Sequence, residues 1–196
     1  MADGDRPGPD RWWEYLLETW RELDVPDGWR AEIDDGRIAL LPPAHPHVHA
    51  VRAVIQRALY GVLPEDWGVY QVLALHLSPP GKVYVPDLVV APSELLDGED
   101  PDVANPIDAS EALLVAEVTS KGNGRDDRGK RPWAYAHACV PVCLLVDRFD
   151  EHGPTTTLFA EPENGAYTHI ERIAFGKPLV LPEPFGLSID TGAFPR

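Results

Sequence analysis

Few cysteines, no long hydrophobic run and a shortage of basic residues set the first limits on this protein. The two cysteines, Cys139 and Cys143, are too few for a disulfide framework, and we expect both to be small buried apolar residues. No apolar run approaches the roughly 18 residues that a membrane-spanning helix needs. Residues 1–10 are polar and contain no apolar segment of the kind found in signal peptides, so we expect a cytoplasmic protein.

The charge is strongly one-sided. There are 17 Lys and Arg residues against 32 Asp and Glu residues, which gives a formal net charge of -15. Such a chain is repelled by the phosphates of nucleic acid, and this argues against a protein that coats a duplex without regard to sequence. A nucleic-acid substrate remains compatible with the sequence if a bound metal ion or a local basic patch offsets the overall charge.

The length of 196 residues suits one domain of ordinary size that buries its own core. We expect residues 1–10 to be a disordered leader and residues 11–196 to form a single domain. Apolar side chains recur at helical spacing from Trp13 to Leu23 and again at about 47–63, which predicts two helices. Asp35-Gly36, between two short apolar segments, predicts a β-hairpin.

The rest of the chain is expected to alternate strands with one further helix. The apolar run 113–118 suits a strand buried on both faces, and it is followed by a helix at about 126–138 and a second buried strand at 142–146. A crossover of this kind makes its two strands parallel. Further strands are expected at about 68–77, 83–91 and 185–189, with a hairpin around residues 163–165. The fold class is therefore α/β (α+β), with a mixed sheet flanked by helices.

Two acidic residues interrupt apolar strands. Asp87 follows Pro86 within the segment 83–90, and Glu117 lies in the run 113–118. A charge inside an apolar strand is costly unless it is paired or binds a metal ion. Either carboxylate alone could pair with a basic side chain at a strand end. Two carboxylates on neighbouring strands could instead converge on Mg²⁺ or Mn²⁺, which prefer hard oxygen ligands.

A basic segment follows the strand that carries Glu117. Residues 119–131 contain five basic and two acidic residues, in a chain that is otherwise strongly negative. The segment comes after the carboxyl end of a strand, where open α/β sheets bind ligands. It could therefore receive a phosphate group, or it could be a solvated loop and helix face.

These motifs together resemble a known family. The ordered set is Pro86-Asp87, Glu117-Val118-Thr119-Ser120, Asp127-Arg128-Gly129-Lys130-Arg131, Tyr135 and the segment 140–147. With this set the chain resembles the bacterial Uma-type family of restriction-endonuclease-like proteins, within the PD-(D/E)xK nuclease superfamily. The resemblance is close from about Glu32 to Asp147. It implies a restriction-endonuclease-like fold with a mixed sheet core.

The resemblance also implies roles for particular residues. Asp87 and Glu117 match the metal-binding acids. In the superfamily a lysine stands two positions after the second acid, where this chain has Thr119. In the Uma-type family the lysine comes instead from the following helix, four residues before a tyrosine. That count, taken back from Tyr135, falls on Arg131.

We expect Lys130, one residue earlier, to be the catalytic basic residue, with Arg131 second and Lys121 third. A lysine ammonium can orient a water or offset charge on a phosphate, whereas arginine is a poorer fit to a single-point contact. Glu32 matches an acid near the N-terminal hairpin and could be a third metal ligand. His47 or His49 matches a histidine at the start of the second helix. The run 45–49 could also bind a soft metal ion, but a proline-rich helix lead-in is the favoured interpretation.

The sequence therefore supports two functions. The first is an endonuclease that hydrolyses DNA phosphodiester bonds with Mg²⁺ or Mn²⁺ held by Asp87, Glu117 and Glu32. The second is a catalytically weak or inactive module of the same fold that binds nucleic acid or a protein partner. A homodimer is compatible with the first function, because cutting both strands of a duplex is simplest with two sites related by a two-fold axis.

Overall fold

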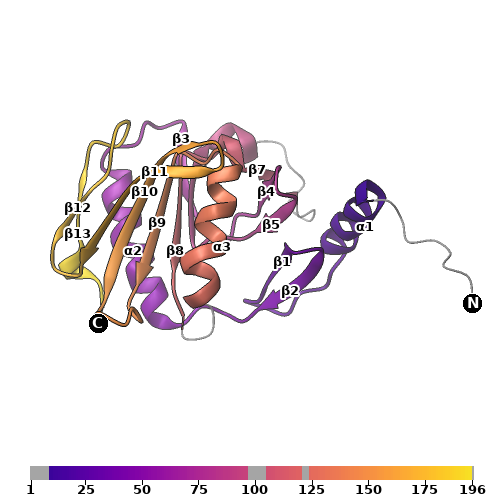
Figure 1. Cartoon of the computed structure of the whole chain (residues 1–196), viewed down its shortest axis with the longest axis horizontal. Helices are drawn as coiled ribbons and strands as arrows, with labels where there is room; N and C mark the ends of the chain where they lie inside the picture. Colours follow the sequence, from indigo (N-terminus) through magenta and orange to yellow (C-terminus); the bar gives the residue numbers. More distant parts are fainter. Residues whose placement is uncertain (1–8, 97–104, 121–123, 196) are drawn as a thin grey trace, which may run out of the picture.

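The strands form two larger sheets and one short pair in this computed structural model, which describes residues 9–96, 105–120 and 124–195 (Figure 1). Most of the expected leader, residues 1–8, lies outside the described residues, as does Lys121. Pro9 and Asp10, which were expected in the leader, belong to helix α1 (Pro9–Arg21). The mixed α and β architecture confirms the expected fold class.

The larger sheet has six strands in the order β11-β10-β9-β8-β6-β3. Strands β8 and β9 are parallel and are joined by helix α3, as the sequence predicted, while their neighbours run antiparallel. The hairpin expected around residues 163–165 joins β10 to β11. The bounds are β3 Trp67–Tyr70, β6 Leu88–Pro92, β8 Leu114–Val118, α3 Gly124–His137, β9 Val142–Asp147, β10 Thr155–Glu163 and β11 Ala166–Ala174.

The second sheet has five strands in the order β2-β1-β5-β4-β7. Its outer hairpin turns at Asp35-Gly36, where both residues have positive φ (48° and 71°), a conformation that Asp and Gly tolerate well. The single strand expected at 68–77 is wrong, because β3 and β4 belong to different sheets. The single strand expected at 83–91 is wrong for the same reason, because β5 and β6 belong to different sheets. The bounds are β1 Arg30–Asp34, β2 Arg37–Leu41, β4 Leu75–Leu77, β5 Lys82–Tyr84 and β7 Ile107–Asp108.

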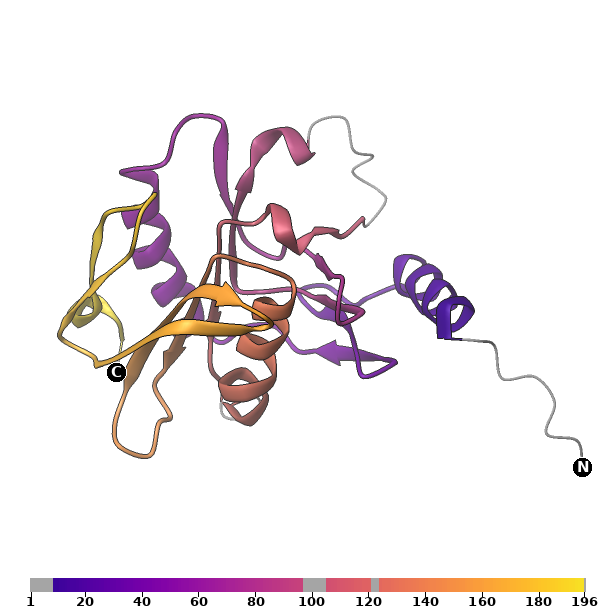
Figure 2. The same ribbon diagram turned by 45° about the horizontal axis from the view of Figure 1, so that its top comes forward.

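Apolar side chains alternate between the two faces of the six-stranded sheet and define two cores. On one face Leu88, Val90 and Leu144 pack against helix α2 (Pro46–Tyr60) and the C-terminal pair β12 (Pro178–Val180) and β13 (Ser188–Asp190). On the other face, Val89 and Val115 pack with α3 and with strands β4 and β5. Helix α3 therefore lies where the two sheets meet, as Figures 1 and 2 both show.

Helix α1 covers the outer part of the five-stranded sheet. Leu16 and Trp20 are buried against Ile33 and Val83, and the Trp20 indole donates a hydrogen bond to the carbonyl of Ala31 (2.8 Å). No helix among the described residues is long and apolar enough to cross a membrane. Both cysteines are free; Cys143 is buried as expected, but Cys139 is exposed after the end of α3, so that part of the cysteine prediction is wrong.

Candidate functional site

Asp87 lies in the short link between the two sheets. It follows β5 of the five-stranded sheet and precedes β6 of the six-stranded sheet, and it is only 3% exposed. Its Oδ2 accepts a hydrogen bond from the backbone N–H of Val118 (2.7 Å), at the end of β8. Its Oδ1 accepts from the guanidinium groups of Arg30 (3.3 Å) and Arg52. The link thus presents a buried carboxylate beside the strand that carries Glu117.

Glu117 and Glu32 meet on the guanidinium of Arg131. Arg131 Nη1 lies 2.9 Å from Glu117 Oε1, and Nη2 lies 2.7 Å from Glu32 Oε2. Tyr135, one helical turn further along α3, donates its hydroxyl to the same Glu117 oxygen (2.5 Å). The other Glu32 oxygen accepts from the backbone N–H of Val85 (2.8 Å). Carboxylates from both sheets are therefore held together by one arginine from the helix between them.

The guanidinium of Arg131 is fixed on a third side by an aromatic ring. Its Cζ lies 4.6 Å from the centre of the Tyr84 ring, a favourable cation–π distance. The Tyr84 hydroxyl in turn donates to Asp34 (2.9 Å). With two carboxylate partners and a stacked ring, Arg131 has a defined orientation that a flexible surface arginine lacks.

The charges at this site balance. Glu32, Asp87 and Glu117 supply three carboxylates, and Arg30, Arg52 and Arg131 supply three guanidinium groups; we call these six residues the acid–arginine cluster. Their side chains are between 2% and 13% exposed. Buried charges are tolerated when they are paired and hydrogen-bonded in this way.

The structure places Lys130 away from the carboxylates of the acid–arginine cluster. Its Nζ lies near Asp35 (2.9 Å) and Asp34 (3.3 Å) of the β1–β2 hairpin, and its side chain is 46% exposed. Among the α3 residues whose side chains the structure describes, Arg131 is the basic residue that bonds to Glu117. The helical period explains the difference, since Arg131 shares a face with the buried Ala134 and Tyr135 whereas Lys130 is turned by about 100° from that face.

Arg52 was not expected at the site. It lies on α2, where Val48, Val51, Ile55 and Leu59 form the buried stripe at spacings of three and four residues. Arg52 falls within this stripe and is 2% exposed. A charged residue within an apolar helical stripe is the sequence signal that could have identified it. Arg30 stands at the start of a strand and gives no such signal.

Two tyrosine hydroxyls remain protonated at neutral pH. Burial and the nearby Glu117 carboxylate raise the pKa of Tyr135 well above its usual value. Burial and Asp34 do the same for the pKa of Tyr84. Both hydroxyls therefore act as hydrogen-bond donors, Tyr135 to Glu117 and Tyr84 to Asp34.

The oxygen donors of the cluster suit a hard divalent cation, but the guanidinium groups already occupy them. Three buried carboxylates provide the ligand type that Mg²⁺ and Mn²⁺ prefer. Among the residues that the structure describes, no three acidic, histidine or cysteine side chains are grouped closely enough to hold a metal ion. Arg52 and Arg131 bind one oxygen of Asp87 and of Glu117, respectively, so a cation would compete with them for these two carboxylates. The carboxylate oxygens are therefore suitable ligands for a divalent cation, and the cation would compete with the guanidinium groups for them.

Thr119 occupies the position at which the superfamily has its lysine, and its role in this structure is to form a hydrogen bond between strands. It is fully buried, and its hydroxyl donates to Asp147 at the end of β9 (2.9 Å). Asp147 also accepts from Arg128 (2.6 Å). Burial acts to raise the pKa of Asp147, but these hydrogen bonds outweigh it and lower the pKa. Thr119 thus ties the ends of the two parallel strands together.

The two histidines at the start of α2 differ in their surroundings. His49 is exposed. His47 is partly buried near Thr119, and its ring meets the ring of Phe149 edge-on (centroids 6.3 Å apart). Neither histidine belongs to the acid–arginine cluster.

Comparison with known proteins assigns the chain to a family. The family model "Uma2: Putative restriction endonuclease" matches residues 15–192. The crystal structure of "a putative nuclease belonging to DUF820" from Anabaena variabilis ATCC 29413 has a similar fold, with a TM-score of 0.69 and 14% sequence identity, over 93% of this chain and 96% of that one. Among curated proteins no match was found. Because the family model spans nearly the whole chain, this protein belongs to the Uma2 family of restriction-endonuclease-like proteins, as its motifs predicted.

Proposed function

We propose that this protein is a divalent-metal-dependent endonuclease that hydrolyses DNA phosphodiester bonds at the acid–arginine cluster. The observation that carries the proposal is that Glu32 and Glu117, from two sheets, meet on Arg131 of α3, while Asp87 bonds to the end of the strand that carries Glu117. Nuclease-fold relatives support the reaction class. Asp87 and Glu117 would hold Mg²⁺ or Mn²⁺, and the ion would stabilise negative charge on the phosphoryl group. Glu32 would join them as a third ligand after it moves away from Arg131.

Arg131 takes the position of the helix-borne lysine in this proposal. Its guanidinium is held against Tyr84, so its charge stays beside Glu117 if one of its carboxylate contacts is released. A guanidinium can then pair with two oxygens of a phosphate, a geometry in which arginine is superior to lysine. Tyr135 keeps its proton and holds Glu117 in place. Arg131 would thus bind and orient the phosphate.

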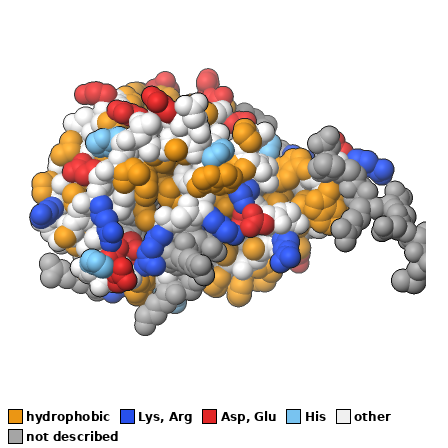
Figure 3. All heavy atoms as spheres, viewed as in Figure 1, with side chains coloured by type: hydrophobic (Ala, Val, Ile, Leu, Met, Phe, Trp, Pro, Cys, Tyr) orange, Lys and Arg blue, Asp and Glu red, His pale blue; other side chains and the backbone are white. Residues whose placement is uncertain are grey.

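Charge on the surface supports an approach path for DNA. On the face seen in Figure 3, acidic side chains gather along the upper edge, whereas Lys and Arg side chains lie mostly across the lower half. A polyanion would meet less repulsion over the basic half, despite the net charge of -15.

The test is nicking of supercoiled plasmid DNA in Mg²⁺ or Mn²⁺ by four chains: the wild type, Asp87→Asn, Glu117→Gln and Lys130→Gln. We expect metal-dependent nicking by the wild type and a loss of at least about a hundredfold in the first two variants, since each removes a charged ligand. Lys130→Gln is the matched control, because Lys130 forms its ion pairs within the described part of the chain with the hairpin acids Asp34 and Asp35. Equal nicking by the wild type, Asp87→Asn and Glu117→Gln would refute the assignment.

A second function is favoured by the balance of charge in the cluster. Three guanidinium groups neutralise the three carboxylates, as in a purely structural ion-pair network. The fold would then serve as a module that binds nucleic acid or a basic protein partner without cutting. Retained DNA binding with no nicking under any divalent metal would favour this function over the first. A homodimer stays a prediction for either function, and sedimentation velocity would test it.

A further inference from the structure

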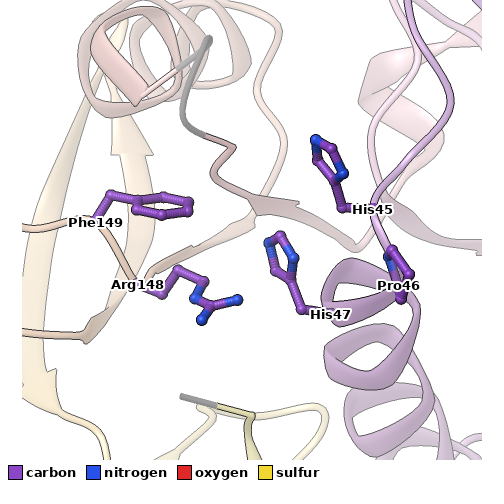
Figure 4. Close-up of a pocket in the computed structure, with 5 residues that line it drawn as sticks. All are labelled: His45, Pro46, His47, Arg148 and Phe149. Atoms are coloured by element: carbon purple, nitrogen blue, oxygen red, sulfur yellow. The ribbon is translucent and has the colours of Figure 1, made fainter.

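A pocket lies at the carboxyl ends of the two parallel strands, beside the start of α2 (Figure 4). It has a volume of about 450 Å³ and is lined by His45, Pro46, His47, Arg148 and Phe149. This size is within the range of small-molecule binding sites. Arg148 and Phe149 directly follow β9, at the edge where open α/β sheets bind ligands.

The pocket adjoins the acid–arginine cluster through Thr119. Thr119 is two residues beyond Glu117, a distance of at most about 7 Å along an extended chain. Its hydroxyl bonds to Asp147, the residue before Arg148, and its backbone forms a hydrogen bond with His47. A strand of nucleic acid lying over Glu117 would therefore place a neighbouring nucleotide at the pocket.

The Arg148 guanidinium makes the pocket suit an anion. The Arg148 guanidinium has no acidic partner among the residues whose side chains are described, and it lies 5.5 Å from the centre of the Phe149 ring. The His47 Nε2 atom is buried and has no hydrogen-bond partner in the described part of the chain. A metal ion is the weaker fit, because the Arg148 charge would repel a cation bound by the two histidines.

The backbone of Phe149 is fixed by two hydrogen bonds. Its backbone N–H donates to Asp147 (2.9 Å), and its carbonyl accepts from Arg128 (3.0 Å). Its ring meets His47 at 82°, so the two rings form a corner beside Arg148. Such a corner offers an apolar surface to a sugar or base next to a charged group for its phosphate.

We propose that this pocket, formed by His45, His47, Arg148 and Phe149, binds a nucleotide phosphate. That phosphate would be next to the phosphodiester bond that is cleaved at the acid–arginine cluster. The inference rests on the proposed action on nucleic acid. The phosphate could be an internal phosphodiester of the strand or a terminal 5′-phosphate. Arg148 supplies its charge and Phe149 packs against the attached nucleoside.

The test measures binding of short fluorescein-labelled single-stranded DNA, with either a 5′-hydroxyl or a 5′-phosphate, by fluorescence anisotropy in EDTA across a salt series. We expect Arg148→Gln to weaken binding about tenfold and to reduce the slope of log K against log salt by about 0.7. Arg148→Lys should retain the slope. Arg57→Gln is the matched control, since Arg57 is exposed at the far end of α2 and should bind as the wild type does.

The outcomes separate this site from the proposed reaction, because no metal is present and no bond is cut. A loss with both DNAs identifies an internal phosphate, and a loss only with the 5′-phosphate identifies a terminal one. Equal binding by the wild type, Arg148→Gln and Arg57→Gln overturns the inference, even if the wild type nicks plasmid. Binding too weak to measure in the wild type also overturns it. Melting temperatures within a few degrees of the wild type show that the variants are folded.

Discussion

Replacing Arg131 with methionine tests whether water is excluded from the ion pairs of the acid–arginine cluster. The side chains of Glu32 and Glu117, its two partners, are only 4% and 6% exposed. Methionine fills much of the volume of arginine but carries no charge, so the variant leaves two buried carboxylates facing each other. Removal of one partner from a buried ion pair costs about 3–5 kcal/mol.

The expected change in stability is large enough to measure in two ways. For a chain of this size, 1 kcal/mol corresponds to about 2–4 °C in melting temperature, so a loss of about 4 kcal/mol lowers it by about 8–16 °C. Urea unfolding followed by tryptophan fluorescence gives the free energy directly. Adding Glu117→Gln to the variant removes one of the two unpaired charges, and we expect it to recover about half of the loss.

Arg57→Met is the control, because Arg57 is exposed and should tolerate the change within about 0.5 kcal/mol. A loss below about 1 kcal/mol for Arg131→Met, the value typical of exposed ion pairs, would show that water reaches the cluster and would refute the reasoning.

Three further predictions concern residues around the acid–arginine cluster. Tyr135→Phe removes the donor to Glu117 and should cost about 1–3 kcal/mol in urea unfolding; an unchanged midpoint would contradict the hydrogen bond. Because the pKa of Asp147 is lowered on folding, its contribution to stability is present above its unfolded value and lost as the pH falls through the folded value, so Asp147→Asn should flatten the acid limb of the stability curve below about pH 4. An acid limb identical to that of the wild type would count against this linkage. Leu144→Ala, at a fully buried position of β9, should cost about 2–5 kcal/mol, and a smaller loss would indicate a collapsed cavity.

The local features of the fold followed from local sequence patterns. Asp35-Gly36 fixed the first hairpin because few other pairs tolerate its backbone angles. The two apolar runs around α3 predicted parallel strands, since the connecting helix leaves them little choice. The division of residues 67–77 between two sheets was missed, because hydrophobic pattern reports burial and does not report which sheet a strand joins.

The acidic residues of the cluster could be identified from the sequence more readily than the arginine residues that pair with them. Asp87 and Glu117 stand out because each interrupts an apolar run of the sequence. Their arginine partners come from β1, α2 and α3, and only folding brings those elements together. The choice between Lys130 and Arg131 depends on a rotation of about 100° around a helix, which a one-residue uncertainty in the start of that helix conceals.

The position of the acid–arginine cluster between two sheets bears on how the protein opens locally. The N-terminal unit of α1, β1 and β2 contributes Glu32 and Arg30, one charge of each sign. If this unit unfolds by itself, Asp87 and Glu117 keep Arg52 and Arg131, and the remaining cluster is still neutral. Such an opening leaves no unpaired charge within the cluster. The N-terminal unit can therefore behave as a cooperative unit of its own, with faster amide exchange than the six-stranded sheet.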